Sequence, residues 1–285
     1  MPNYNGVWSL TTQLQYAADW PVFSQPRALF LGGNTGSKET VIQFIDVTTT
    51  GNASDFGDLT AGRASLMSAS SKIRAVAAGG NTGSAVNVID YVTIASEGNA
   101  SDFGDLSSTS QEGTGTGSST RGLFQLGLAT DNVNTIEYVT IASTGNATDF
   151  GDRTTTAAYG QDSAVSSPTR GVFSGGFISS SVNIIDYVTI ASTGDATDFG
   201  DTSVTRYGMG GASSATRGVF GGGNTSGDTM DYITIASTGN ASDFGNLTNS
   251  PRYISGTSNG VRGIFGGGKV SSTRQDVIQY ITIAS

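Results

Sequence analysis

The sequence lacks the two residue types on which most catalytic and metal sites depend. It contains no Cys and no His, which excludes disulfides, thiolate nucleophiles and imidazole bases or metal ligands. Only 13% of the residues are charged, and the net charge of −9 makes the chain a poor partner for nucleic-acid phosphates. Pro is scarce, at 5 residues. No run of about 18 apolar residues occurs, so no membrane insertion is expected.

Glycine, by contrast, is abundant at 41 residues, and much of it recurs within one repeated unit. Each unit opens on an Arg followed by an apolar segment, and a second segment follows, such as YITIASTGNASDFGNL from Tyr232. The opening arginines stand 47, 47, 49, 47 and 45 residues apart, at Arg27, Arg74, Arg121, Arg170, Arg217 and Arg262. A period in this range is typical of propeller blades.

The pattern within each unit is that of β-strands. In the fifth unit we expect strands over Arg206–Ser213, Arg217–Gly222, Met230–Ser237 and Ser242–Thr248, because alternating apolar runs are separated there by Gly, Ser, Asn and Asp. Four strands in a unit of this length match a propeller blade. The sequence therefore predicts an all-β, six-bladed β-propeller with four antiparallel strands per blade, formed by residues 1–285 as a single domain.

The two ends of the chain are expected to complete the sixth blade together. That unit stops after YITIAS, and the strand-like Val7–Gln13 precedes the predicted first strand of blade one, Leu14–Phe23. We expect Val7–Gln13 to pair with Val277–Ala284, so that blade six comprises about 252–285 plus 7–13. The residues of this predicted closure are Val7, Trp8, Leu10, Tyr280, Ile281 and Ile283, with Trp8 in the place of the fourth-strand Phe of the other blades.

The layout resembles the kelch family of propellers. Kelch units carry a Gly-Gly doublet, then a Tyr, an aromatic residue and often a trailing Arg. The doublets that match are Gly32–Gly33, Gly79–Gly80, Gly175–Gly176, Gly222–Gly223 and Gly267–Gly268. Arg63, Arg206 and Arg252 match the trailing Arg, whereas Ser110 and Ala157 replace it elsewhere, and blade three has Leu126-Gly127 instead of a doublet. The resemblance implies a shared architecture.

The amino-acid sequence of the repeat, together with the opening GVWSL and the later Trp20-Pro21, resembles that of repeat proteins of tailed bacteriophages, particularly those of marine bacteria. This resemblance implies a virion protein, made in the bacterial host cytoplasm, whose partners are other virion proteins. The first residues, MPNYNGVWSL, show no secretory-signal pattern, which agrees with that expectation.

The repeated arginines form the strongest polar pattern. They predict either a ring that grips an anion or, as we favour, a structural clamp in every blade through hydrogen bonds to carboxylates or carbonyls. The third-strand acids Asp90, Glu137, Asp186 and Asp231 are expected at the opposite end of the blade, because neighbouring strands are antiparallel. We therefore expect the arginines to pair with the acids that open the fourth strands, Asp55, Asp102, Asp149, Asp198 and Asp243.

No cofactor or metal is predicted, and the chain is not expected to be an enzyme. The Asn-Ala-Ser/Thr-Asp-Phe-Gly-Asp turns have some of the oxygen groups that calcium requires, but Asp149 and Asp152 fall on opposite faces of a strand. The same residue types are typical of turns. Carboxylate pairs can hydrolyse glycosidic bonds, but the acids here follow the repeat, whereas a catalytic pair breaks it.

Two functions remain open. The leading hypothesis is a non-enzymatic, tail- or capsid-associated virion protein that mediates protein–protein contacts. The alternative is a module that binds a host-surface glycan or receptor. Loops on a rigid scaffold carry function, and the segments that vary most between units are Asn34–Thr40, Asn81–Val86, Ala129–Asn134, Phe177–Ser181, Asn224–Thr229 and Lys269–Gln275.

Overall fold

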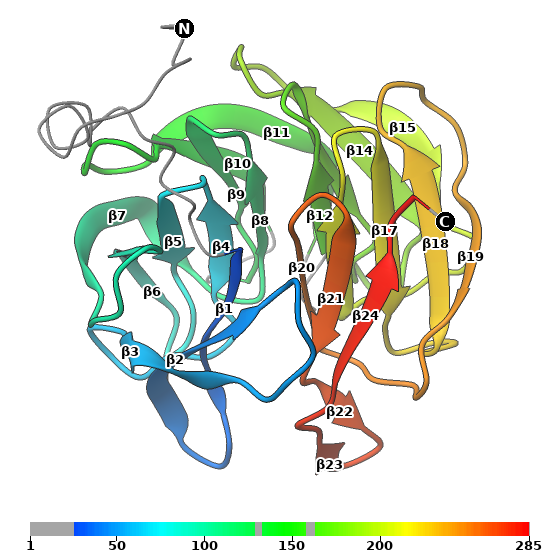
Figure 1. The fold of residues 1–285 in the computed structure, drawn as a ribbon. Coiled ribbons are helices and arrows are strands. Elements are labelled where there is room, and N and C mark those ends of the chain that lie inside the picture. Colours follow the sequence, from blue (N-terminus) through cyan, green and yellow to red (C-terminus); the bar gives the residue numbers. More distant parts are fainter. Residues whose placement is uncertain (1–25, 129–132, 158–162, 285) are drawn as a thin grey trace, which may run out of the picture.

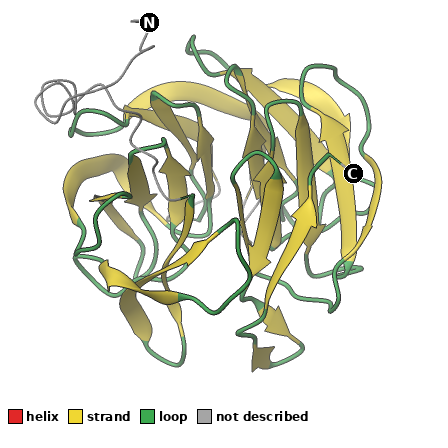
Figure 2. Ribbon diagram, in the orientation of Figure 1, coloured by secondary structure: helices red, strands yellow, loops and turns green. Residues whose placement is uncertain are grey.

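The computed structural model describes residues 26–128, 133–157 and 163–284, and this part of the chain is built from antiparallel β-sheets arranged as a six-bladed propeller (Figure 1). No helix occurs among these residues, and hence none that could span a membrane (Figure 2). The alternation of buried and exposed residues along the strands, as in Met67–Ser70, is the alternation that favours sheet over helix.

Four blades have four described strands each. Blade two contains β4 (Met67–Ser70), β5 (Arg74–Ala78), β6 (Val86–Thr93) and β7 (Ser101–Ser110). Blade three contains β8 (Thr114–Gly117), β9 (Arg121–Gln125), β10 (Val133–Thr140) and β11 (Thr148–Ala157). Blade four contains β12 (Ser163–Ser166), β13 (Arg170–Ser174), β14 (Ile184–Thr189) and β15 (Thr197–Asp201). Blade five contains β16 (Met209–Ser213), β17 (Arg217–Gly222), β18 (Thr229–Thr234) and β19 (Ser242–Asn246).

The first and last blades have three described strands each. Blade one contains β1 (Arg27–Asn34), β2 (Lys38–Asp46) and β3 (Ser54–Asp58), and blade six contains β20 (Ser255–Ser258), β21 (Arg262–Gly266) and β24 (Ile278–Thr282). A small hairpin of β22 (Lys269–Val270) and β23 (Thr273–Arg274) projects from blade six (Figure 1). The sequence pattern had indicated only a loop there. Within each blade, hydrogen-bonded neighbours are consecutive in the chain, apart from this insertion.

The fifth blade shows how well the strand predictions hold. Strand two is confirmed at Arg217–Gly222, and strands one, three and four lie where expected but are shorter. Strand one begins at Met209 because Gly208 has a left-handed backbone, with φ of 73°, which interrupts the extended conformation.

The hydrophobic core lies between neighbouring blades. Met67, Val76, Ile89 and Phe103 of blade two cluster with residues of blade three such as Phe124, all at most 2% exposed. Because both faces of each sheet are covered in this way, the strands read as nearly continuous apolar runs.

The outer edges of neighbouring blades are joined by the turn between the third and fourth strands. Gly145 N–H donates to Phe103 O at 2.7 Å, and Asn146 Oδ1 accepts from Asp105 N–H at 3.1 Å. The same bonds recur between blades one and two, three and four, and four and five, with Asn99, Asp195 and Asn240 in the place of Asn146. The repeated TGNASDFGD segment therefore joins neighbouring blades, and its Asn side chain accepts one of the hydrogen bonds between them.

Blade six packs against blade one. Ile264 clusters with Ala28, Ile45 and Val47, and Arg262 Nη1 donates to Val47 O at 3.0 Å, a contact that spans 215 residues. The predicted outer strand, with Val7, Trp8 and Leu10, lies outside the described residues, as does Leu14–Phe23, so joint completion of blade six stays a prediction. Of the residues predicted for this closure that the structure describes, Ile281 is half-buried in β24, Ile283 is buried just after it, and Tyr280 is 53% exposed.

Candidate functional site

The six repeated arginines clamp each blade to the next. Each Nη1 donates to a carbonyl oxygen that follows the third strand of the following blade, at 2.9 to 3.2 Å. The pairs are Arg27 to Ile94, Arg74 to Ile141, Arg121 to Ile190, Arg170 to Ile235, Arg217 to Ile283 and Arg262 to Val47. Each guanidinium also lies 4.3 to 4.6 Å from the centre of the third-strand aromatic ring of its own blade.

This arrangement differs from the Arg–Asp pairing that we expected. The predicted partners, Asp55, Asp102, Asp149, Asp198 and Asp243, are all exposed at the start of the fourth strands. The strand register explains the difference: Arg74 lies opposite Thr93, whereas Asp102 lies opposite Asp90, three residues earlier in the same strand. Carbonyl oxygens of the neighbouring blade lie within reach of the arginines instead.

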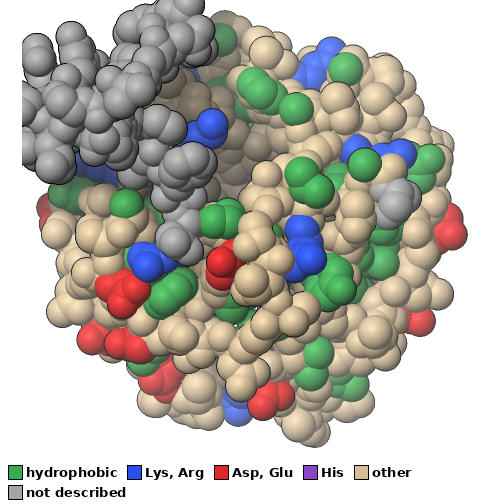
Figure 3. Space-filling view, viewed as in Figure 1, with side chains coloured by type: hydrophobic (Ala, Val, Ile, Leu, Met, Phe, Trp, Pro, Cys, Tyr) green, Lys and Arg blue, Asp and Glu red, His purple; other side chains and the backbone are tan. Residues whose placement is uncertain are grey.

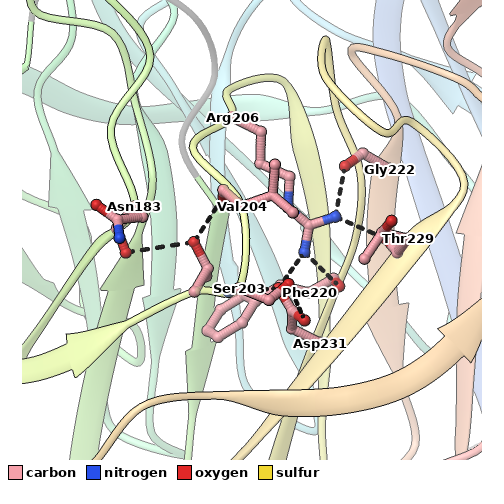
Figure 4. Close-up of polar contacts among 9 residues, drawn as sticks. Asn183, Ser203, Val204, Arg206, Phe220, Gly222, Thr229 and Asp231 are labelled. Atoms are coloured by element: carbon pink, nitrogen blue, oxygen red, sulfur yellow. Dashed lines mark hydrogen bonds and ion pairs between the residues drawn. The ribbon is translucent and has the colours of Figure 1, made fainter.

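The buried ion pairs use a different set of residues. Asp90, Asp186 and Asp231 on the third strands are fully buried, and they accept from Arg63 at 2.5 Å, Arg153 at 2.9 Å and Arg206 at 2.7 Å. In Figure 4 the guanidinium of Arg206 also reaches the carbonyls of Gly222 and Thr229. These bonds attach the segment that precedes the first strand of a blade to the second and third strands of that blade.

Burial lowers the pKa of the Arg63 and Arg206 guanidiniums, an effect that the facing aspartates partly offset. Blade four has no trailing Arg. Its buried Asp186 pairs instead with Arg153, which stands at the repeat position that Leu59 occupies in the first unit. The sequence shows both the trailing arginines and the third-strand acids, but we did not connect them. The two sets coincide only in blades two and five, so the sequence carries little signal of the pairing.

Blade six breaks this pattern. Gln279 stands where Asp231 and Asp90 stand in other blades, and its Oε1 already accepts from the N–H and the hydroxyl of Thr248, both at 2.7 Å. Arg252, the trailing Arg of this blade, therefore has no carboxylate to bind. Among the described residues its guanidinium makes no hydrogen bond or ion pair, and its Nε, like those of Arg63 and Arg206, is buried without a partner.

Arg252 instead lines an open pocket of about 350 Å³ between blades five and six. The wall also contains backbone of the glycine-rich loop at Gly223 and Gly227. The side chains that line the pocket are polar: Asn224, Ser250, Arg252, Lys269 and Ser271. Two of the variable segments that we expected to carry function, Asn224–Thr229 and Lys269–Gln275, thus contribute to one pocket.

A row of aromatic side chains runs beside this pocket. The rings of Phe177 and Tyr207 lie 5.5 Å apart, those of Tyr207 and Tyr253 lie 6.1 Å apart, and Arg252 Cζ lies 5.5 Å from the Tyr253 ring. Asn224 connects row and pocket, because its Oδ1 accepts from Tyr207 N–H at 2.9 Å. Phe177 comes from a third variable segment, Phe177–Ser181, so loops of blades four, five and six meet here.

Tyr253 is held in a strained conformation. Its φ is 58°, in the left-handed region that a bulky residue rarely adopts, but this backbone belongs to the repeat: the equivalent Ser65, Glu112 and Gly208 have φ of 55°, 62° and 73°. The side chain is 38% exposed. Burial of part of the ring, together with a hydrogen bond with Tyr207, raises the pKa of the Tyr253 phenol. Tyr253 was not among our predicted residues, since its contact with Tyr207 joins two blades and is visible only in the structure.

The pocket offers groups that can bind a ligand through hydrogen bonds and charge. The pocket side chains are amide, hydroxyl and cationic groups, without an acid to serve as base. In the described part of the chain, no group of three or more Asp or Glu side chains gathers into a metal site. Neither the models of known protein families nor the curated proteins with which the chain was compared match it.

Proposed function

We propose that this propeller is a non-enzymatic recognition module that binds a glycan at the junction of blades four, five and six. The observation that carries this proposal is the row of Phe177, Tyr207 and Tyr253 beside a polar pocket. Sugar rings present C–H groups that pack on aromatic faces, and their hydroxyls bind amide and hydroxyl side chains such as those of Asn224 and Ser250.

The scaffold supports this proposal. The blades carry the loops on strands fixed by buried cores and by the arginine clamps, so the loops can vary without loss of the fold.

The test is a glycan array probed with the wild-type chain and two variants. Tyr253→Gly removes the ring but suits the left-handed backbone, as Gly208 does in blade five. Ile73→Ser, at an exposed side chain in the turn before β5, is the matched control. We expect the glycans bound by wild type to lose about tenfold in affinity with Tyr253→Gly and to be unaffected by Ile73→Ser. An array without hits, or hits indifferent to Tyr253→Gly, contradicts the proposal.

The resemblance of the repeat sequence to phage proteins favours a second, compatible proposal, which concerns where the protein is located. We propose that it is a virion protein with a kelch-like propeller, attached to the particle by a face or side of the disc. Imaging of the phage particle with a labelled chain tests it. A position at a fibre tip supports recognition of a host glycan, whereas a buried position at a head or tail joint supports a role in assembly and contradicts recognition.

A further inference from the structure

The charge of the pocket restricts the ligand. We propose that Arg252 and Lys269 form an anion subsite, so that the glycan bound beside Tyr253 carries an anionic group, a carboxylate or a phosphate. This inference rests on the proposed glycan-binding function and adds the chemical class of the ligand.

The first argument comes from comparison within the repeat. Arg63 and Arg206 each bind a buried aspartate, together with two backbone carbonyls for Arg63 and three for Arg206. Arg252 is their counterpart in blade six, but Gln279 replaces the acid and is already satisfied by Thr248 and by Asn249. Arg252 thus keeps the charge of a carboxylate-binding residue, but no carboxylate among the described residues pairs with it, in contrast to Arg63 and Arg206.

The second argument comes from the backbone. Arg252 and Lys269 are directly opposite each other in an antiparallel bridge, with N–H to O distances of 3.0 and 2.8 Å in the two directions. Opposite residues of such a pair project from the same face, and like charges at such positions repel each other. The Lys269 side chain makes no hydrogen bond or ion pair with any residue that the structure describes. An anion placed between the two groups removes this repulsion.

The third argument comes from the charge of the whole chain. It has 23 acidic and 14 basic residues, and basic side chains are scattered over the mainly uncharged surface in Figure 3. The pocket, lined by two cations and no carboxylate, therefore has a local positive charge on a chain whose net charge is negative. A guanidinium binds carboxylate or phosphate oxygens through paired hydrogen bonds, and Ser250 and Ser271 supply further donors.

Calorimetric titration with four probes tests the inference: D-glucuronate, D-glucose 6-phosphate, inorganic phosphate and D-glucose. The variants are Arg252→Gln, Lys269→Gln and, as the control with the same change of charge, Lys72→Gln in an exposed turn before β5. Melting curves confirm that each variant is folded, and Lys269→Gln serves if Arg252→Gln does not fold. We expect anionic sugars to bind at least tenfold more tightly than glucose, an advantage lost in both pocket variants and kept with Lys72→Gln.

The outcomes separate this inference from the proposed function. Preference for glucuronate over glucose 6-phosphate, or the reverse, identifies the anionic group. Equal binding of glucose and the anionic sugars, unchanged in the pocket variants, overturns the anion subsite and leaves glycan recognition standing. Binding of inorganic phosphate through Arg252 and Lys269 without binding of any sugar supports the subsite and overturns glycan recognition. Binding of none of the four probes overturns the subsite.

Discussion

Single residues within one repeat position differ in their energetic role, and the third-strand acids illustrate this. Asp231 is fully buried and accepts from Arg206 and from the Ser203 hydroxyl at 2.7 Å. Glu137 is almost as buried but accepts only from Ser107 among the described residues. A buried ion pair adds little net stability, but removal of one partner leaves a desolvated charge.

Asp231→Ala is therefore expected to destabilise the fold strongly, by about 3–5 kcal/mol, because Arg206 then remains buried without its carboxylate. Urea unfolding measures this change. Asp243→Ala is the matched control, since Asp243 lies opposite Asp231 in the strand register but is exposed, and we expect an effect within about 0.5 kcal/mol. Equal losses in the two variants contradict this account of the ion pair.

Glu137→Gln provides a second comparison. Gln279 occupies the equivalent place in blade six and accepts the same pair of bonds from Thr248 that Glu137 accepts from Ser107. We therefore expect this substitution to cost less than about 1 kcal/mol, since the acceptor oxygen is kept and no cation is left unpaired.

At the scale of the strand and turn, the Gly of the repeated Asp-Phe-Gly segment determines how close two blades come. Gly104 has φ of 148°, and a Cβ at this position would lie 2.5 Å from the backbone of Gly145 in the next blade. The inter-blade bonds of Gly145 and Ala147 depend on this approach. The sequence marks this glycine as repeated, but the contact that requires it joins two units.

Gly104→Ala is accordingly expected to destabilise the protein by about 3 kcal/mol or more, through both the clash with Gly145 and the strained backbone. Gly51→Ala is the control: Gly51 lies in a turn of blade one, with open space around its Cβ position and no left-handed φ. Thermal unfolding of the two variants checks the prediction. A melting temperature for Gly104→Ala equal to that of Gly51→Ala would show that the turn adapts.

At the scale of the whole molecule, the arginine clamps run from each blade to the next. The step from blade six to blade one uses the same chemistry as the others, since Arg262 reaches Val47 as Arg121 reaches Ile190. In an open array of repeats the end units would fray first. A ring in which the ends are joined lacks free ends, so it is expected to unfold as one unit.

We therefore expect Arg262→Ala and Arg121→Ala to lower the free energy of unfolding by similar amounts, about 1–3 kcal/mol, each in a single transition. Both arginines are half-buried, and each loses a carbonyl bond and an aromatic contact. Urea unfolding followed by tyrosine fluorescence and circular dichroism measures both. If Arg262→Ala leaves stability unchanged while Arg121→Ala reduces it, the contact between the end blades does not stabilise the ring.

The sequence by itself determined the repeat, the strands and the six blades, because these depend on alternation and spacing within a unit. It also predicted that variable loops such as Asn224–Thr229 would carry function, and that loop does line the pocket. The partners of the repeated arginines were decided only by the tertiary structure, since Arg74 binds a carbonyl 67 residues away in the next blade. The candidate site was likewise decided by the tertiary structure, because Phe177, Tyr207 and Tyr253 belong to different blades and meet only where three loops converge.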